Sequence, residues 1–170
     1  MGLKFKDPWT PEFLERLIRP LVEAERLVWC GVRVSGNRRQ ALFQVTVDRE
    51  DGFITIDDCT VLSRLLQDIL DLETGVPENY QLIVSSPGID SPLSLEWQFR
   101  KNQGRFIQCP EVGGGLEGKI ISVSPSGVVQ LEVRGKSVTK TVSELEGARV
   151  TVMMPERKNP NRKRNETRNR

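Results

Sequence analysis

The chain has 170 residues, of which 37% are apolar and 28% charged, so it can form one globular domain or two small ones. No apolar run is long enough for a membrane span and the N-terminus lacks an apolar signal core, so a cytoplasmic protein is expected. There is no histidine, and Cys30, Cys59 and Cys109 lie far apart, which excludes the usual zinc ligand sets and histidine-based catalysis. We expect three buried, reduced thiols.

The first part of the chain predicts a helix followed by two strands. Thr10 before Pro11 is a typical helix start, and apolar residues then recur at helical spacing up to Val22. Pro20 is expected to bend or divide this helix. Two runs then alternate with the period of strands: Val28, Cys30, Val32 and Val34, and after them Ala41, Phe43, Val45 and Val47.

A second helix and a third strand follow. Thr55 and Asp58 form an acidic variant of the capping box, and an apolar stripe extends from Leu62 to Leu70. Tyr80, Leu82 and Val84 then alternate as a strand. The order α-β-β-α-β, with a right-handed crossover, places the third strand beside the first and both helices on one face of a three-stranded sheet.

A stiff segment comes next, and we expect it to join two domains, residues 1–93 and 94–155. Pro87-Gly88 predicts the centre of a type II turn, in which glycine supplies a positive φ. Asp90 is expected to accept backbone N–H bonds, and the nearby serines to cap or turn the chain. Such a segment is either a rigid corner or a loop that binds a partner. The candidate partner-binding residues are Ser85, Ser86, Pro87, Gly88, Asp90 and Pro92.

The second half predicts a small β-barrel. A short helix over residues 95–101 precedes five short strands, over 105–109, 116–123, 128–134, 137–142 and 149–153. Closing such strands into a barrel buries a core that an open sheet leaves exposed, and the short turn at residues 143–145 suits an SH3-like barrel. The fold class predicted for the whole chain is therefore α+β.

Charge is distributed unevenly, and the last fifteen residues are basic. Residues 1–93 carry 10 Lys and Arg against 15 Asp and Glu, residues 94–155 carry 8 against 6, and residues 156–170 carry 7 against 2. An acidic first part favours basic protein partners, whereas a basic, disordered tail suits RNA phosphates, with a solubilising tail as the alternative. The candidate RNA-binding residues are Arg157, Lys158, Arg162, Lys163, Arg164 and Arg168.

Three motifs carry a family resemblance: Val47-Asp48, Asp57-Asp58-Cys59 followed by Ser63, and the run from Val84 to Leu93. Together they resemble RimP, a family of bacterial ribosome maturation factors, over about residues 11–154. The resemblance implies an SH3-like second domain and a small-subunit ribosomal protein as a direct partner.

The chain departs from the family pattern at two places. Ser91 stands where the family usually has arginine, and Glu25-Arg26 stands where the first helix tends to close with glycine. If that arginine contacts phosphate or a partner, the role is weakened or moved in this chain.

The function expected from these features is noncatalytic assembly of the small ribosomal subunit. A monomer without cofactor or metal would bind immature subunits through rRNA and a ribosomal protein. One alternative is a stand-alone RNA-binding module. The other is a phosphate-handling enzyme that uses Gly113 to Lys119, a near match to a phosphate-binding loop that lacks the final Ser or Thr and a following helix.

Overall fold

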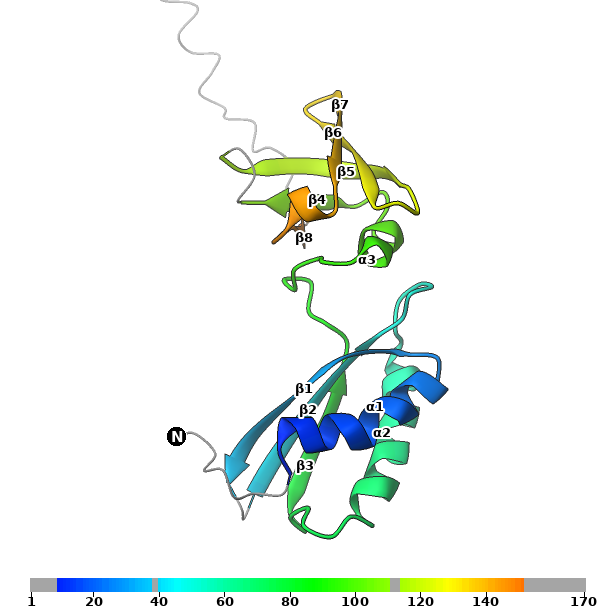
Figure 1. Ribbon diagram of the computed structural model, residues 1–170, viewed down its shortest axis with the longest axis vertical. Coiled ribbons are helices and arrows are strands. Elements are labelled where there is room, and N and C mark those ends of the chain that lie inside the picture. The colour runs from blue at the N-terminus through cyan, green and yellow to red at the C-terminus, as the bar shows by residue number, and fades with distance from the viewer. Residues whose placement is uncertain (1–8, 38–39, 111–113, 152–170) are drawn as a thin grey trace, which may run out of the picture.

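The computed structural model describes residues 9–37, 40–110 and 114–151, and it contains two β-sheets. The sheets lie at opposite ends of the molecule, joined by the segment after β3 (Figure 1). A helix followed by a three-stranded sheet, with a five-stranded antiparallel sheet later, confirms the α+β class. No helix in the described ranges is long and apolar enough to cross a membrane. The basic residues 157–168 lie outside the described residues.

α1 (Pro11–Ala24) begins at the predicted residue. The Thr10 hydroxyl accepts a hydrogen bond from the Phe13 N–H at 3.2 Å, and Pro11 lies in the first turn, where a missing N–H breaks no helical bond. The helix continues through Pro20, so this proline does not divide it, and the alternative of a bend at Pro20 stays a prediction. A fully buried stripe on both sides of Pro20 holds the helix against the sheet: Leu14, Ile18 and Val22.

A residue other than glycine closes α1 in the left-handed region. Arg26 has a φ of 58°, and the Leu27 N–H donates to the Val22 carbonyl at 3.1 Å, which is the long hydrogen bond of a Schellman cap. Glycine usually fills this position because a Cβ is strained there by about 1 kcal/mol. Arg26 therefore adopts the backbone conformation for which glycine is preferred.

A β-bulge interrupts the first hairpin. β1 (Val28–Asn37) pairs antiparallel with β2 (Gln40–Asp48), and the register shifts between Trp29 and Gly31. The extra residue changes the predicted alternation, because Trp29, and not Cys30, packs with Val32 and Val34 against the core.

The bulge also overturns one expectation for the cysteines. Cys30 is exposed, whereas Cys59 is partly buried and Cys109 is buried, so the prediction of three buried thiols is wrong at Cys30.

α2 (Ile56–Leu70) begins with the predicted capping box. The Asp58 N–H donates to the Thr55 hydroxyl at 3.1 Å, and the Thr55 N–H donates to the Asp58 carboxylate at 2.9 Å. The core-facing stripe is narrower than predicted, since Leu65 is 37% exposed while other leucines of the helix are buried: Leu62, Leu66 and Leu70.

β3 (Tyr80–Ser85) pairs in parallel with β2, which gives the sheet order β1-β2-β3. The prediction that the third strand lies beside the first is therefore wrong. The central place goes to β2, whose inward side chains Ala41, Phe43, Val45 and Val47 are all fully buried. β1 contains the bulge, which suits an end strand.

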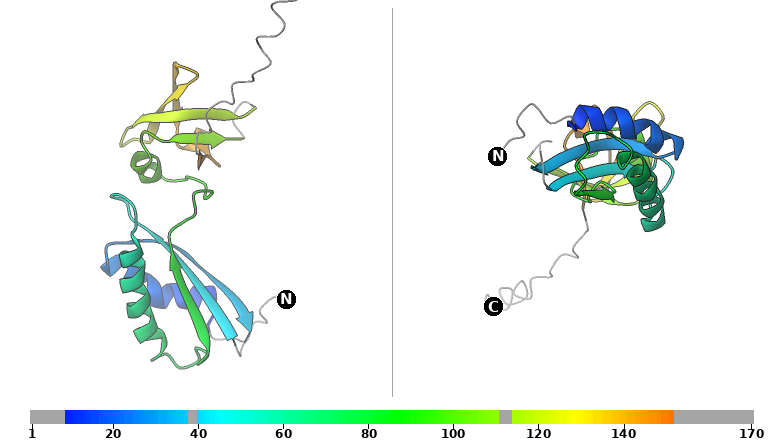
Figure 2. Two further views of the ribbon diagram at one scale, coloured as in Figure 1. Left: turned by 180° about the vertical axis from the view of Figure 1, so that it is seen from behind. Right: turned by 90° about the horizontal axis from the view of Figure 1, so that it is seen from below.

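Both helices pack on the same face of this sheet. The buried residues of α1, α2 and the inward face of β2 form one hydrophobic cluster, with Tyr80, Leu82 and Val84 packed against it. The opposite face is turned toward the viewer in the left view of Figure 2, with no described helix in front of it. The prediction that the helices cover one face is confirmed.

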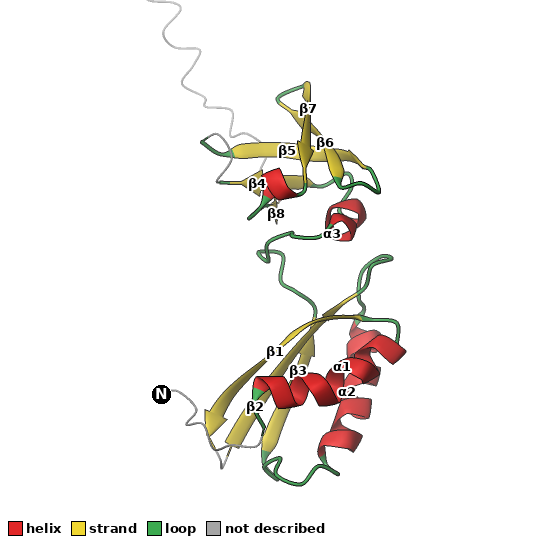
Figure 3. Cartoon of the chain, viewed as in Figure 1, coloured by secondary structure: helices red, strands yellow, loops and turns green. Residues whose placement is uncertain are grey.

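The second half begins with α3 (Glu96–Lys101) and continues with five strands. Figure 3 colours the helix red and the strands yellow. The strands are β4 (Phe106–Cys109), β5 (Leu116–Val123), β6 (Val128–Val133), β7 (Lys136–Thr141) and β8 (Arg149–Thr151). Their antiparallel order is β7-β6-β5-β4-β8. In the described strands this order is open, since β7 and β8 do not pair, so closure into an SH3-like barrel is not confirmed.

A separate hydrophobic cluster supports the second sheet. It is built from buried residues of the strands, α3, the segment before α3 and the segment before β8: Leu93, Phe99, Ile107, Cys109, Ile120, Val129, Leu131, Leu145 and Ala148. The short predicted turn is a 3₁₀ helix, η1 (Ser143–Leu145). The Glu144 carboxylate accepts hydrogen bonds from the Thr141 N–H at 2.8 Å and from Lys140 Nζ at 2.9 Å, which closes the turn after β7.

Candidate partner-binding site

The segment that follows β3 forms a turn, but not the predicted one. The Ser91 N–H donates to the Gly88 carbonyl at 2.9 Å, so Ile89 and Asp90 are the central residues. Gly88 does not have a positive φ, and a Cβ added to it would meet no atom within 4 Å. The prediction of a type II turn centred on Pro87-Gly88 is therefore wrong, because the proline fixes the entry to the turn and the following residues make the bend.

The polar side chains of this segment do not hold it together. Within the described part of the chain, the side chains of Ser85, Ser86, Asp90 and Ser91 make no hydrogen bond. The prediction that Asp90 accepts backbone N–H bonds is wrong. Of the prediction that the serines cap or turn the chain, capping by their side chains is wrong, while Ser91 takes part in the turn through its backbone N–H. All but the partly buried Ser91 are exposed, so their hydroxyl and carboxylate groups are open to a partner.

Leu93 anchors the end of the segment to the second sheet. Its side chain is buried in the second cluster, and its N–H donates to the Ala148 carbonyl at 2.7 Å. Pro92, directly before it, is exposed. The candidate residues therefore form a surface loop fixed at one end by β3 and at the other by Leu93.

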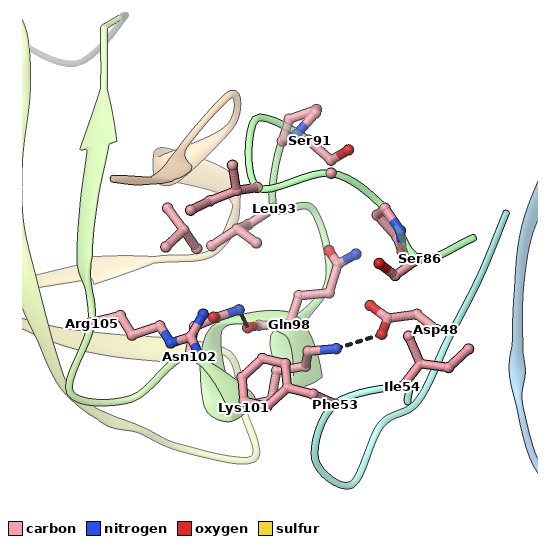
Figure 4. Close-up of a pocket in the computed structure, with 15 residues that line it drawn as sticks. Asp48, Phe53, Ile54, Ser86, Ser91, Leu93, Gln98, Lys101, Asn102 and Arg105 are labelled. Carbon is pink, nitrogen blue, oxygen red and sulfur yellow. Dashed lines mark hydrogen bonds and ion pairs between the residues drawn. The ribbon is translucent and has the colours of Figure 1, made fainter. Parts of the chain in front are cut away.

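A buried ion pair connects the two halves beneath this loop. Lys101 Nζ, at the end of α3, lies 2.6 Å from Asp48 Oδ1 at the end of β2 and donates to the Arg49 carbonyl at 3.2 Å (Figure 4). The side chains of Lys101 and Asp48 are only 7% and 10% exposed. A pair this well shielded from water fixes the position of α3 against the first sheet, because leaving either charge unpaired there is costly.

Phe53 lies between two cations at the same place. Its ring centroid is 5.2 Å from Lys101 Nζ and 4.4 Å from the Arg105 guanidinium carbon, and the ring centroid of Trp97 also lies 5.3 Å from Lys101 Nζ. Such contacts stabilise a cation near an aromatic face. Arg105 makes no ion pair with any residue that the structure describes, so its guanidinium can still bind a partner.

Asp48, Phe53, Lys101 and Arg105 line a pocket of about 240 Å³ between the halves. Its walls come from residues 86–89 and 91–93 of the loop, from the end of β2 and the segment after it, from α3 and the residues that follow it, and from Val150 of β8. Figure 4 shows Ser86, Gln98 and Asp48 directed toward one another across it. The arrangement offers hydroxyl, amide and guanidinium groups to a polar segment of a partner.

The prediction therefore found one wall of the pocket and missed the others. Ser86, Pro87, Gly88 and Pro92 all line it, whereas Ser85 and Asp90 lie outside it. The sequence signals that could have indicated the remaining walls were weak: Asp48 in a family motif, the exposed aromatic Phe53, and the basic residues that end a short helix.

The suspected phosphate-binding loop does not have the required geometry. Gly113 lies outside the described residues, while Gly118 and Lys119 are inside β5, paired with β4. A Cβ at Gly118 would lie 2.8 Å from Val133 Cγ2, so this glycine allows close packing on β6. In the described ranges, no group of three acidic or cysteine side chains is arranged to hold a metal ion.

Residues 17–90 match the family model described as the RimP N-terminal domain. The match starts within α1 and ends at Asp90, in the turn of the loop. It includes Asp48 and Phe53 of the pocket, while α3 and the second sheet lie beyond it.

Proposed function

Because the chain carries the N-terminal domain of the RimP family, we propose that it is a noncatalytic assembly factor for maturation of the small ribosomal subunit. It would bind immature subunits through rRNA and a ribosomal protein and leave before translation. The observation that carries this proposal is the match over residues 17–90, which ends in the loop that lines the pocket.

The structure of the loop supports a role in binding. Its polar side chains are open, its ends are fixed, and the Asp48–Lys101 pair holds the elements beneath it. A surface that is already ordered loses little entropy when a partner binds. In this proposal the loop and the pocket contact the ribosomal protein, and the basic residues 157–168 neutralise rRNA phosphates.

The first test is sedimentation of the tagged protein in a cell lysate at low and moderate salt. The full-length protein should migrate with free small subunits and be absent from whole ribosomes. Gly88→Trp tests whether the loop surface binds the subunit. A side chain added at Gly88 meets open space, so it should not disturb the fold, but it would obstruct the loop surface. This variant should lose most of its comigration while its thermal unfolding stays unchanged.

Ile121→Trp is the control, since Ile121 is 46% exposed on β5 and does not line the pocket. Absence of the wild-type protein from all ribosomal fractions at both salts would contradict the proposal. Tight binding to naked rRNA with a steep salt dependence, unaffected by Gly88→Trp, would favour the stand-alone RNA-binding module instead.

A further inference from the structure

The end strands of the two sheets differ in how their open edges are protected. An open edge exposes unpaired N–H and C=O groups, and proteins usually protect it with charges, bulges, prolines or short length. β1 has a bulge at Cys30 and the exposed Arg33, and β8 has only three residues. β7 carries Lys136 and Lys140.

β3 has none of these devices. The strand Tyr80–Ser85 contains no charged residue, proline or bulge, and it pairs with β2 alone. Its outer N–H and C=O groups make no hydrogen bond to any residue that the structure describes. Ile83, in the middle of the strand, is 44% exposed. The edge is therefore open for the pairing of another strand.

We propose that β3 binds an extended, basic segment of a partner protein, which adds to the first sheet as a fourth strand beside it. Backbone hydrogen bonds to the outer edge would supply affinity, and the side chains next to the edge would select the sequence. This inference does not rest on the proposed function, because it follows from the edge and the charges around it.

Carboxylates at both ends of β3 indicate that the segment is basic. Asp71 accepts a hydrogen bond from the Tyr80 hydroxyl at 2.8 Å, and burial, together with the charges of Asp71 and Asp68, raises the pKa of Tyr80. Asp90 lies just beyond the other end. Residues 56–90 as a whole carry seven Asp and Glu against one Arg, so lysine or arginine in the added strand would gain favourable electrostatic interactions.

The same charges disfavour a second copy of this chain at the edge. Antiparallel pairing of β3 with β3 of another copy would bring Asp68 and Asp71 of each chain toward Asp90 of the other. Like charges opposed across an interface are unfavourable, so the two copies would repel. A basic partner has no such conflict.

The side chains of β3 indicate which residues the segment carries between its basic ones. Tyr80, Leu82 and Val84 are only partly buried on the core face, so apolar side chains of an added strand would extend the hydrophobic cluster past them. Gln81, Ile83 and Ser85 lie on the open face. Apolar residues in alternation with lysine or arginine fit both faces.

The test is titration of the full-length, ¹⁵N-labelled protein with a peptide in which valine alternates with lysine. We expect chemical-shift changes centred on residues 80–85 and slower hydrogen exchange of the outer β3 amides. Ile83→Lys should weaken binding about tenfold, since it places a positive charge on the open face of β3, where the lysines of the peptide lie. Ile121→Lys, at a similarly exposed position on the central strand β5, should have no effect.

Two further reagents keep the test decisive if Ile83→Lys unfolds the strand. Asp68→Lys leaves β3 intact and should also weaken binding, and a peptide with alternate backbone N-methylation should not bind. The proposal is overturned if the N-methylated peptide, or one with glutamate in place of lysine, binds as tightly. The proposal is also overturned if neither Ile83→Lys nor Asp68→Lys changes the binding of the peptide. It is overturned as well if the protein forms a dimer that Ile83→Lys abolishes.

Discussion

Gly88 and Arg26 adopt backbone conformations opposite to what their residue types suggest. Gly88 has no positive φ, although it follows a proline in a turn, whereas Arg26 has a φ of 58° at the end of α1. The cap needs that conformation because the Leu27 N–H must reach the Val22 carbonyl. The strain at Arg26 is therefore a local cost of ending the helix there, and glycine would remove it.

Arg26→Gly is expected to raise the free energy of unfolding by about 1 kcal/mol, because it relieves the left-handed strain without changing the cap. The measurement is the urea midpoint of the full-length protein. Arg26→Ala is the control, since alanine removes the charge but keeps the Cβ. An equal gain in both variants would show that loss of the charge, and not the backbone strain, is responsible.

At the scale of the element, η1 depends on one ionised side chain. Glu144 accepts hydrogen bonds from the Thr141 N–H, Lys140 Nζ and the Thr141 hydroxyl, which lower the pKa of its carboxyl to about 2. An ordinary glutamate titrates near 4.5. The charged carboxylate therefore stabilises the folded chain above the unfolded pKa, and this contribution disappears as the pH falls toward the folded one.

Glu144→Gln should therefore lower stability at pH 6, and its difference from the wild type should shrink between pH 4.5 and about 2. Thermal unfolding of both proteins across this range measures the effect. Glu146→Gln, two residues later, is the matched control. A difference between wild type and Glu144→Gln that stays constant from pH 6 to pH 2 would contradict the account.

Most elements could be predicted from the sequence, because caps and alternating side chains are local signals. The Thr55–Asp58 capping box is such a case. The β-bulge at Cys30 could not be predicted, since its register is set by pairing with β2. The place of β3 in the sheet could not be predicted either. A right-handed crossover allows β3 to pair with either β1 or β2, and the burial of β2 in the centre of the sheet determines which.

At the scale of the whole molecule, the Asp48–Lys101 pair connects two separate hydrophobic clusters. Its members are 53 residues apart, so no local pattern could have paired them. The loop above this pair could be predicted from the sequence, because its prolines and glycine are a clear turn signal. The role of Lys101 could not be predicted, because a basic residue at the end of a helix is common. The pocket therefore had to be found in three dimensions.

Asp48→Asn and Lys101→Met should each lower the free energy of unfolding by about 3 kcal/mol, because each leaves a buried charge without its partner. The free energy of unfolding of the double variant should fall by clearly less than the sum of the two single losses. A double-mutant cycle from urea unfolding measures this difference. Small-angle scattering of the single variants should also show a wider range of orientations between the sheets. Additive losses with unchanged scattering would mean that the pair does not couple the halves.

The parallel pairing of β2 with β3 also determines the order in which the molecule can fold. Phe43 pairs with Leu82, 39 positions later, whereas Val133 at the end of β6 pairs with Lys136, three positions later. Contacts between distant residues form slowly, because a long loop must close before they are made. In a newly synthesised chain β3 can join the first sheet only after Ser85 has been made. The second sheet waits in the same way for β8, because Ile107 pairs with Val150, 43 positions later, so each sheet combines a local hairpin with one strand that must arrive late.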